Sequence, residues 1–124
     1  MMSSLIHQRI RNRIIEILEW ILESEYKVPE LGFNELINSW ADWADILVNN
    51  PNFPLTYTAS EINSLMNVNL AIEAFCESTP PMVPDIPDIL ALPEWSQLVS
   101  SARLAHAELM KRGRFSEDVV SRYE

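Results

Sequence analysis

The sequence predicts an all-α protein, a single-domain bundle of four main helices with a proline-rich segment between the third and fourth helices and a short C-terminal helix. Apolar residues make up 48% of the 124 residues, which is enough for one core and argues against disorder. The chain has only two glycines but eight prolines, which suits long helices joined by proline loops better than a sheet with tight glycine turns. Four stretches have apolar residues at helical spacing, and no internal repeat divides residues 1–124, so we expect one domain.

The first helix is expected over residues 4–26, with Ser3 or Ser4 as its cap. An arginine, Arg11, and His7 project on the same side as its apolar stripe, so the apolar face is interrupted in the first turns. Two interpretations remain open. This end of the helix overhangs the core in solvent, or it docks on acidic residues of this chain or of a second copy.

The second helix is the most regular, with apolar residues at i, i+3, i+4 and i+7 over residues 33–48. We expect Asn34 to cap its start and residues 49–51 to end it. Its polar side carries Glu35, Asn38, Asp42 and Asp45. The proline loop that follows contains Phe53 and Tyr57, which we expect to fold back onto the core.

The third helix is expected over residues 59–77, behind a capping box formed by Thr58 and Glu61. Apolar residues occupy most of its circumference, which predicts a central, well-covered helix. Asn69 and Glu73 fall among these apolar positions, one helical turn apart, and are expected to form a hydrogen bond with each other.

Residues 78–93 contain five prolines, so we expect an extended segment with one turn at 88–92, packed on the core. The fourth helix should begin near Pro93 and end before Gly113, and a last short helix should follow Ser116. The residues expected in the core are Ile14, Leu18, Ile37, Trp40, Leu65, Ile72, Leu98 and Leu109.

The net charge of −9 comes from the middle of the chain. Residues 28–102 contain ten acidic residues and no lysine or arginine, whereas the segments on either side are close to neutral. An acidic surface repels nucleic acid and anionic lipid and attracts basic proteins. The alternative is that the charge only keeps the protein soluble.

The single cysteine, Cys76, excludes an internal disulfide, and no apolar stretch is long enough to cross a bilayer. The N-terminal residues do not have the pattern of a secretory signal. We therefore expect a soluble cytoplasmic protein that binds neither membranes nor nucleic acid.

The sequence contains no glycine-rich phosphate loop and no cysteine–histidine metal array. A metal or acid–base site would need Asp42, Asp45, Glu73 and His106 to converge in the folded chain. His106 itself is expected to be a hydrogen-bonded core residue, because it lies within the apolar stripe of the fourth helix. We accordingly expect no enzyme activity, no cofactor and no bound metal.

These observations favour a small acidic module that occupies a basic surface of a partner protein. The most concrete version is a bacterial immunity or inhibitor protein that neutralises a toxin such as a nuclease, since a nuclease cleft must be basic to hold phosphates. The alternatives are a helical-bundle enzyme or metal-binding protein, and a structural or adaptor homodimer that associates through the first helix. The expected partner-binding residues are Glu35, Asn38, Asp42, Asp45, Asp85 and Asp88.

Overall fold

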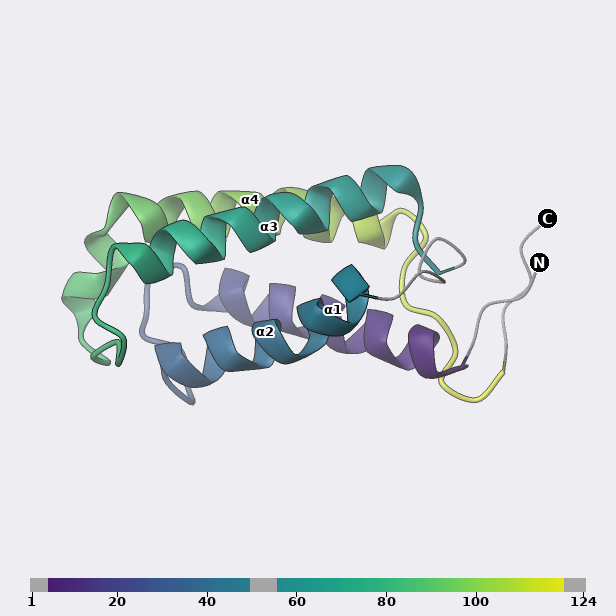
Figure 1. Cartoon of the computed structure of the whole chain (residues 1–124), viewed down its shortest axis with the longest axis horizontal. Coiled ribbons are helices and arrows are strands. Elements are labelled where there is room, and N and C mark those ends of the chain that lie inside the picture. The colour runs from purple at the N-terminus through teal and green to yellow at the C-terminus, as the bar shows by residue number, and fades with distance from the viewer. Residues whose placement is uncertain (1–4, 50–55, 120–124) are drawn as a thin grey trace.

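The computed structural model describes residues 5–49 and 56–119, in which four long helices form an all-α bundle (Figure 1). The helices are α1 (Leu5–Glu23), α2 (Phe33–Asn49), α3 (Ala59–Glu77) and α4 (Pro93–Met110). A short 3-10 helix, η2 (Pro87–Ala91), precedes α4. The described residues include no strand, and the predicted all-α class is confirmed.

The helices form two layers, with α1 beside α2 and α3 beside α4 (Figure 1). α4 packs on both α3 and α1, so α1 and α4 make the main contact between the layers, and the rings of Phe33 in α2 and Phe75 in α3 also meet. Of the eight predicted core residues only Ile37 is partly exposed, and the other seven are buried: Ile14, Leu18, Trp40, Leu65, Ile72, Leu98 and Leu109. None of the helices in the described part of the chain is long and apolar enough to span a bilayer.

α1 ends at Glu23, three residues before the predicted end of the first helix. The Ser24 hydroxyl donates to the carbonyl oxygen of Trp20, as does the Ser24 amide, which closes the last turn. The expected caps, Ser3 and Ser4, lie outside the described residues.

The start of α2 is held by the proline-rich segment and not by Asn34, so the predicted cap was wrong. The Phe33 amide donates to a carboxylate oxygen of Asp85 at 3.0 Å. Asn34 instead exchanges two hydrogen bonds with the backbone of Val83, at 2.8 and 3.0 Å. Gly32 has a φ of 91°, and a Cβ at this position would lie 2.8 Å from the same carboxylate, so only glycine fits there.

α3 has the predicted bounds and the predicted capping box between Thr58 and Glu61. One side of it is open to solvent, however, so the prediction of a central, well-covered helix was wrong. Leu70 is 62% exposed and Met66 is also exposed, because α3 lies at the edge of a two-layer bundle and only one side of it meets other helices.

α4 begins at Pro93 and is followed by Gly113, as predicted. Gly113 has a φ of 78°, and its amide donates to the carbonyl of Leu109, which ends the helix in the left-handed conformation that glycine favours. The chain then crosses from α4 to α1.

No helix forms in residues 113–119, where the predicted C-terminal helix was to begin. Asn12 of α1 bonds to both the amide and the carbonyl of Phe115, just before the expected cap. The side-chain amide of Gln8 donates to the carbonyls of Ser116 and Val119, which such a helix would use for its own hydrogen bonds. The expectation for residues 120–124 lies outside the described part of the chain.

Candidate partner-binding surface

A buried ion cluster lies where the first turns of α1 and α3 meet the end of α4. Arg11 has no exposed surface, and its guanidinium donates to both carboxylate oxygens of Glu61 at 3.0 and 3.1 Å. Arg112 forms a second ion pair with the same carboxylate. The remaining Arg11 donors bond to the carbonyls of Thr56, Leu109 and Gly113. The acid that Arg11 meets thus belongs to its own chain.

The surroundings of Glu61 favour its charged form. Burial raises the pKa of Glu61, but hydrogen bonds from Arg112, from Arg11 and from the Thr58 amide outweigh this effect and hold the pKa below its usual value. Tyr57 is buried next to this cluster, and burial raises the pKa of its hydroxyl. Its burial agrees with the expectation that this residue folds back onto the core, whereas Phe53 lies outside the described residues.

The other ion pairs also neutralise cations within the chain. Two of these pairs involve exposed cations. Arg103 pairs with Glu25 at 2.9 Å, and Lys111 pairs with Glu108 at 2.8 Å. Arg13 pairs with Glu16 and Glu117, and Arg114 pairs with Glu19. Glu61 is the acid of residues 28–102 in these pairs, and neither Glu35, Asp42, Asp85 nor Asp88 takes part in them.

The acidic side of α2 is exposed. Glu35, Asn38, Asp42 and Asp45 all face solvent, as their helical spacing predicts. Neither Glu35 nor Asp42 takes part in any ion pair of the described residues. The charges of Glu35 and Asp42 are therefore not compensated by the cations that pair with acids elsewhere in the described residues.

Two further exposed acids, Asp85 and Asp88, lie between α3 and α4 in the chain, and Asp85 reaches the first turn of α2. Asp85 is exposed and also caps α2 through the Phe33 amide, so its carboxylate lies at the N-terminal end of that helix. Asp88 is exposed on η2. We call the group of Glu35, Asn38, Asp42, Asp45, Asp85 and Asp88 the acidic surface.

His106 has the predicted hydrogen-bond partner but is not fully buried. Its Nε2 lies 3.1 Å from a carboxylate oxygen of Glu19, and a quarter of the side chain is exposed. It therefore belongs to the interface between α4 and α1, whereas Asp42 and Asp45 lie on the solvent side of α2 and Glu73 on the solvent side of α3. Within residues 5–49 and 56–119, no three histidine, cysteine or acidic side chains come together in a way that could hold a metal ion.

Asn69 and Glu73 form the expected pair, although their hydrogen bond is long at 3.5 Å. The Asn69 carbonyl oxygen also accepts a bond from the Trp40 indole at 3.2 Å. This asparagine therefore connects α2 to α3, and the interaction is structural.

A hollow between α1 and α2 borders the acidic surface, and we did not predict it from the sequence. Its volume is about 180 Å³, and the partly buried rings of Trp20 and Trp43 line it together with Ser39, Ile17, Arg13 and Glu16. Ser39 lies one helical turn from both Glu35 and Asp42. The only sequence signal was the position of these tryptophans at the edges of their apolar stripes.

Comparisons of the chain with protein-family models, curated proteins and solved structures find no match.

Proposed function

We propose that this protein is a small acidic binding module that occupies a basic surface of a partner protein. In its most concrete form it is a bacterial, cytoplasmic immunity or inhibitor protein, and the partner is a toxin such as a nuclease. The acidic surface faces the partner, and binding blocks the partner's basic cleft. A cleft that holds phosphates must be basic, so an acidic inhibitor gains both faster association and complementary contacts.

The observation that carries this proposal is the separation of the charges. Six of the arginines and lysines near the two chain ends form ion pairs with acids of α1, α3, α4 or residues 25 and 117: Arg11, Arg13, Arg103, Lys111, Arg112 and Arg114. The exposed carboxylates of Glu35, Asp42, Asp85 and Asp88 have no such partner among the described residues. Uncompensated charge of one sign raises the rate at which an oppositely charged protein associates.

The hollow lined by Trp20 and Trp43 offers apolar contacts, which the acidic surface by itself does not provide. Binding energy at protein interfaces is concentrated in a few anchor residues that fill pockets, with tryptophan and arginine enriched among them. An apolar side chain of the partner that enters between Trp20 and Trp43 would meet aromatic faces, beside the ion pair of Arg13 with Glu16. The acidic surface would then set the association rate, and the hollow would slow dissociation.

The test begins with isolation of the partner by co-purification with the full chain from the source organism. Association rates are then measured against ionic strength for the wild type and for the Glu35→Lys/Asp42→Lys double variant. We expect the wild-type rate to fall with added salt, because exposed charges are screened beyond about 8 Å at physiological ionic strength. The double variant should associate at least about tenfold more slowly.

The matched control is Glu73→Lys/Glu77→Lys, which makes the same charge change on the exposed side of α3. Its association rate should fall less than that of the α2 variant. If the partner is a nuclease, one equivalent of the wild type should also stop its cleavage of DNA. Equal association rates for both variants and the wild type, without salt dependence, would show that the acidic surface serves solubility only.

A further inference from the structure

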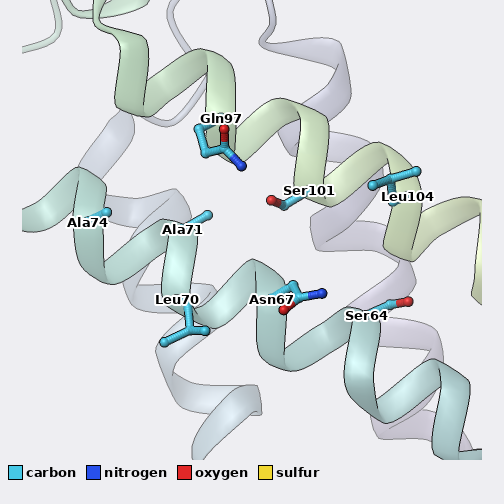
Figure 2. Close-up of a pocket in the computed structure, with 8 residues that line it drawn as sticks. All are labelled: Ser64, Asn67, Leu70, Ala71, Ala74, Gln97, Ser101 and Leu104. Atoms are coloured by element: carbon cyan, nitrogen blue, oxygen red, sulfur yellow. The ribbon is translucent and has the colours of Figure 1, made fainter.

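A hollow of about 460 Å³ lies between α3 and α4, in the layer opposite α2 (Figure 1). Figure 2 shows Gln97 and Ser101 of α4 opposite Asn67 and Ala71 of α3, with the Gln97 carboxamide directed into the space between the helices. We call this site the α3–α4 hollow. The lining residues that matter for its chemistry are Ser64, Asn67, Ala71, Ala74, Gln97 and Ser101.

Polar groups at this hollow have no partner among the described residues. The Ser101 side chain is the most buried of them, since the residue is only 9% exposed, and Figure 2 shows its hydroxyl pointing between α3 and α4. Neither this hydroxyl nor the carboxamides of Asn67 and Gln97 form a hydrogen bond within the described part of the chain. A buried polar group is normally hydrogen-bonded, so an unpaired hydroxyl beside a hollow points to a ligand that supplies the bond.

The protein uses helical carboxamides to hold non-helical chain in two other places. Asn34 of α2 donates to the Val83 carbonyl at 2.8 Å and accepts from the Val83 amide at 3.0 Å. Asn12 of α1 makes the same two bonds with Phe115, at the same distances. Val83 and Phe115 both lie in segments that are neither helix nor strand. A carboxamide contains a donor and an acceptor, so it matches the free amide and carbonyl of one backbone residue.

Asn67 and Gln97 present the same groups beside a hollow that suits an extended backbone. Residues 64–74 of α3 rise by roughly 15 Å, which is about the length of four to five extended residues. The short side chains of Ala71 and Ala74 leave room for a backbone to approach. A bound helix would not satisfy the carboxamides, because its interior amides and carbonyls bond to one another. The geometry therefore favours an extended segment.

Two acidic residues at one end of the hollow specify the charge of the occupant. Glu77 of α3 and Glu94 of α4 lie one helical turn beyond Ala74 and Gln97, which are close to the same end of the hollow in Figure 2. Neither carboxylate takes part in an ion pair of the described residues. Their charge repels a second copy of this acidic chain and attracts a lysine or arginine.

We propose that the α3–α4 hollow binds an extended, basic segment of another protein. The backbone of the segment bonds to Asn67, Gln97 and Ser101, its uncharged side chains fill the hollow, and a lysine or arginine lies beside Glu77 and Glu94. The site lies in the layer opposite α2 and does not depend on the acidic surface.

The probe is a phage-displayed library of random peptides of about 12 residues, longer than the hollow, selected on the full chain. Selection is repeated on Ala74→Trp, which places a large ring in the hollow from an exposed position. We expect only the wild type to enrich peptides in which a lysine or arginine adjoins about four uncharged residues. Circular dichroism and urea unfolding verify that the variant remains folded.

The carboxamide contacts are tested by isothermal titration calorimetry with synthetic copies of the enriched peptides. Asn67→Ala/Gln97→Ala removes both carboxamides and should raise the dissociation constant more than about tenfold. The matched control is Asn38→Ala/Asn63→Ala, which removes two exposed carboxamides outside the hollow. It should bind the peptides like the wild type.

The charge and the conformation of the bound segment are tested separately. Glu77→Gln/Glu94→Gln should weaken binding and reduce its dependence on salt. Peptides whose uncharged residues are replaced by α-aminoisobutyric acid, which favours a helix, should bind at least about tenfold more weakly. Sedimentation velocity on the wild type and on Ala74→Trp, without peptide, tests for a second copy in the hollow.

Several results would overturn the proposal. If the wild type enriches no peptide over Ala74→Trp, the hollow is not a peptide site. If Asn67→Ala/Gln97→Ala binds the peptides as tightly as the wild type, the carboxamides do not hold the backbone. Tighter binding of the helix-favouring peptides would assign the hollow to a helix, and a dimer that Ala74→Trp abolishes would assign it to a second copy.

Discussion

Arg11 and Glu61, 50 residues apart in the sequence, form a fully buried ion pair at one end of the bundle. The pair explains why a charged residue interrupts the apolar stripe of α1. Of the two interpretations of that interruption, docking on an acid of this chain is correct, and solvation of the overhanging end is wrong. Because Thr58 also uses Glu61 in its capping box, one carboxylate fixes the start of α3 and its contacts with α1 and α4.

Removing one partner of this pair should be strongly destabilising. Glu61→Gln leaves the buried Arg11 guanidinium without a counter-charge, and the free energy of unfolding should fall by about 3–5 kcal/mol. Urea unfolding followed by circular dichroism measures the change. Arg103→Ala breaks the exposed pair with Glu25 and serves as the control, since such pairs contribute about 0–1 kcal/mol. Equal losses for the two variants would contradict a special role for the buried pair.

The same carboxylate should make the protein sensitive to acid. Because the pKa of Glu61 is lowered in the folded state, its stabilising contribution is present above the unfolded pKa of about 4.3 and is lost as the pH falls through the folded pKa. The free energy of unfolding of the wild type should therefore decrease below about pH 4.3, and that of Glu61→Gln should decrease less steeply. Urea unfolding of both proteins between pH 3 and pH 7 tests this. Parallel curves would mean that other carboxylates dominate acid unfolding.

The core of the bundle should be intolerant of truncation at Leu65. This side chain is 1% exposed, and Leu65→Ala should lower the free energy of unfolding by about 2–5 kcal/mol through lost apolar contact and the cavity that remains. Leu31, which is 70% exposed, provides the control with the same substitution. Thermal and urea unfolding should leave the control close to the wild type. A small loss for Leu65→Ala would indicate that the packing around α3 differs from the structure.

Asp85 should have two separable roles, a cap for α2 and a charge on the acidic surface. Asp85→Ala removes the acceptor of the Phe33 amide and should cost about 0.5–2 kcal/mol of stability. Asp85→Asn keeps an oxygen acceptor and should cost less, while it removes the charge. Urea unfolding separates the two variants, with Asp88→Ala as a control on the same segment. If Asp85→Asn is as unstable as Asp85→Ala, the charge and not the hydrogen bond stabilises α2.

Much of the local structure was predictable because it depends on short-range spacing. The bounds of α3, its capping box and the end of α4 before Gly113 follow from neighbouring residues alone. The exposure of Glu35 and Asp42 follows from helical periodicity in the same way. A helix after Ser116 was predicted by the same kind of reasoning, but residues 117–119 are not helical, because Gln8 of α1 takes the carbonyls of Ser116 and Val119.

The sequence by itself determined the four helices, most of the core and the confinement of negative charge to the middle of the chain. Only the tertiary structure decided that Arg11 meets Glu61, that Asp85 and not Asn34 caps α2, and that Leu70 remains exposed. The physical reason is the range of the interactions. Periodicity and caps act over one or two helical turns, whereas these contacts join residues about 50 positions apart or depend on how many helices surround a given face.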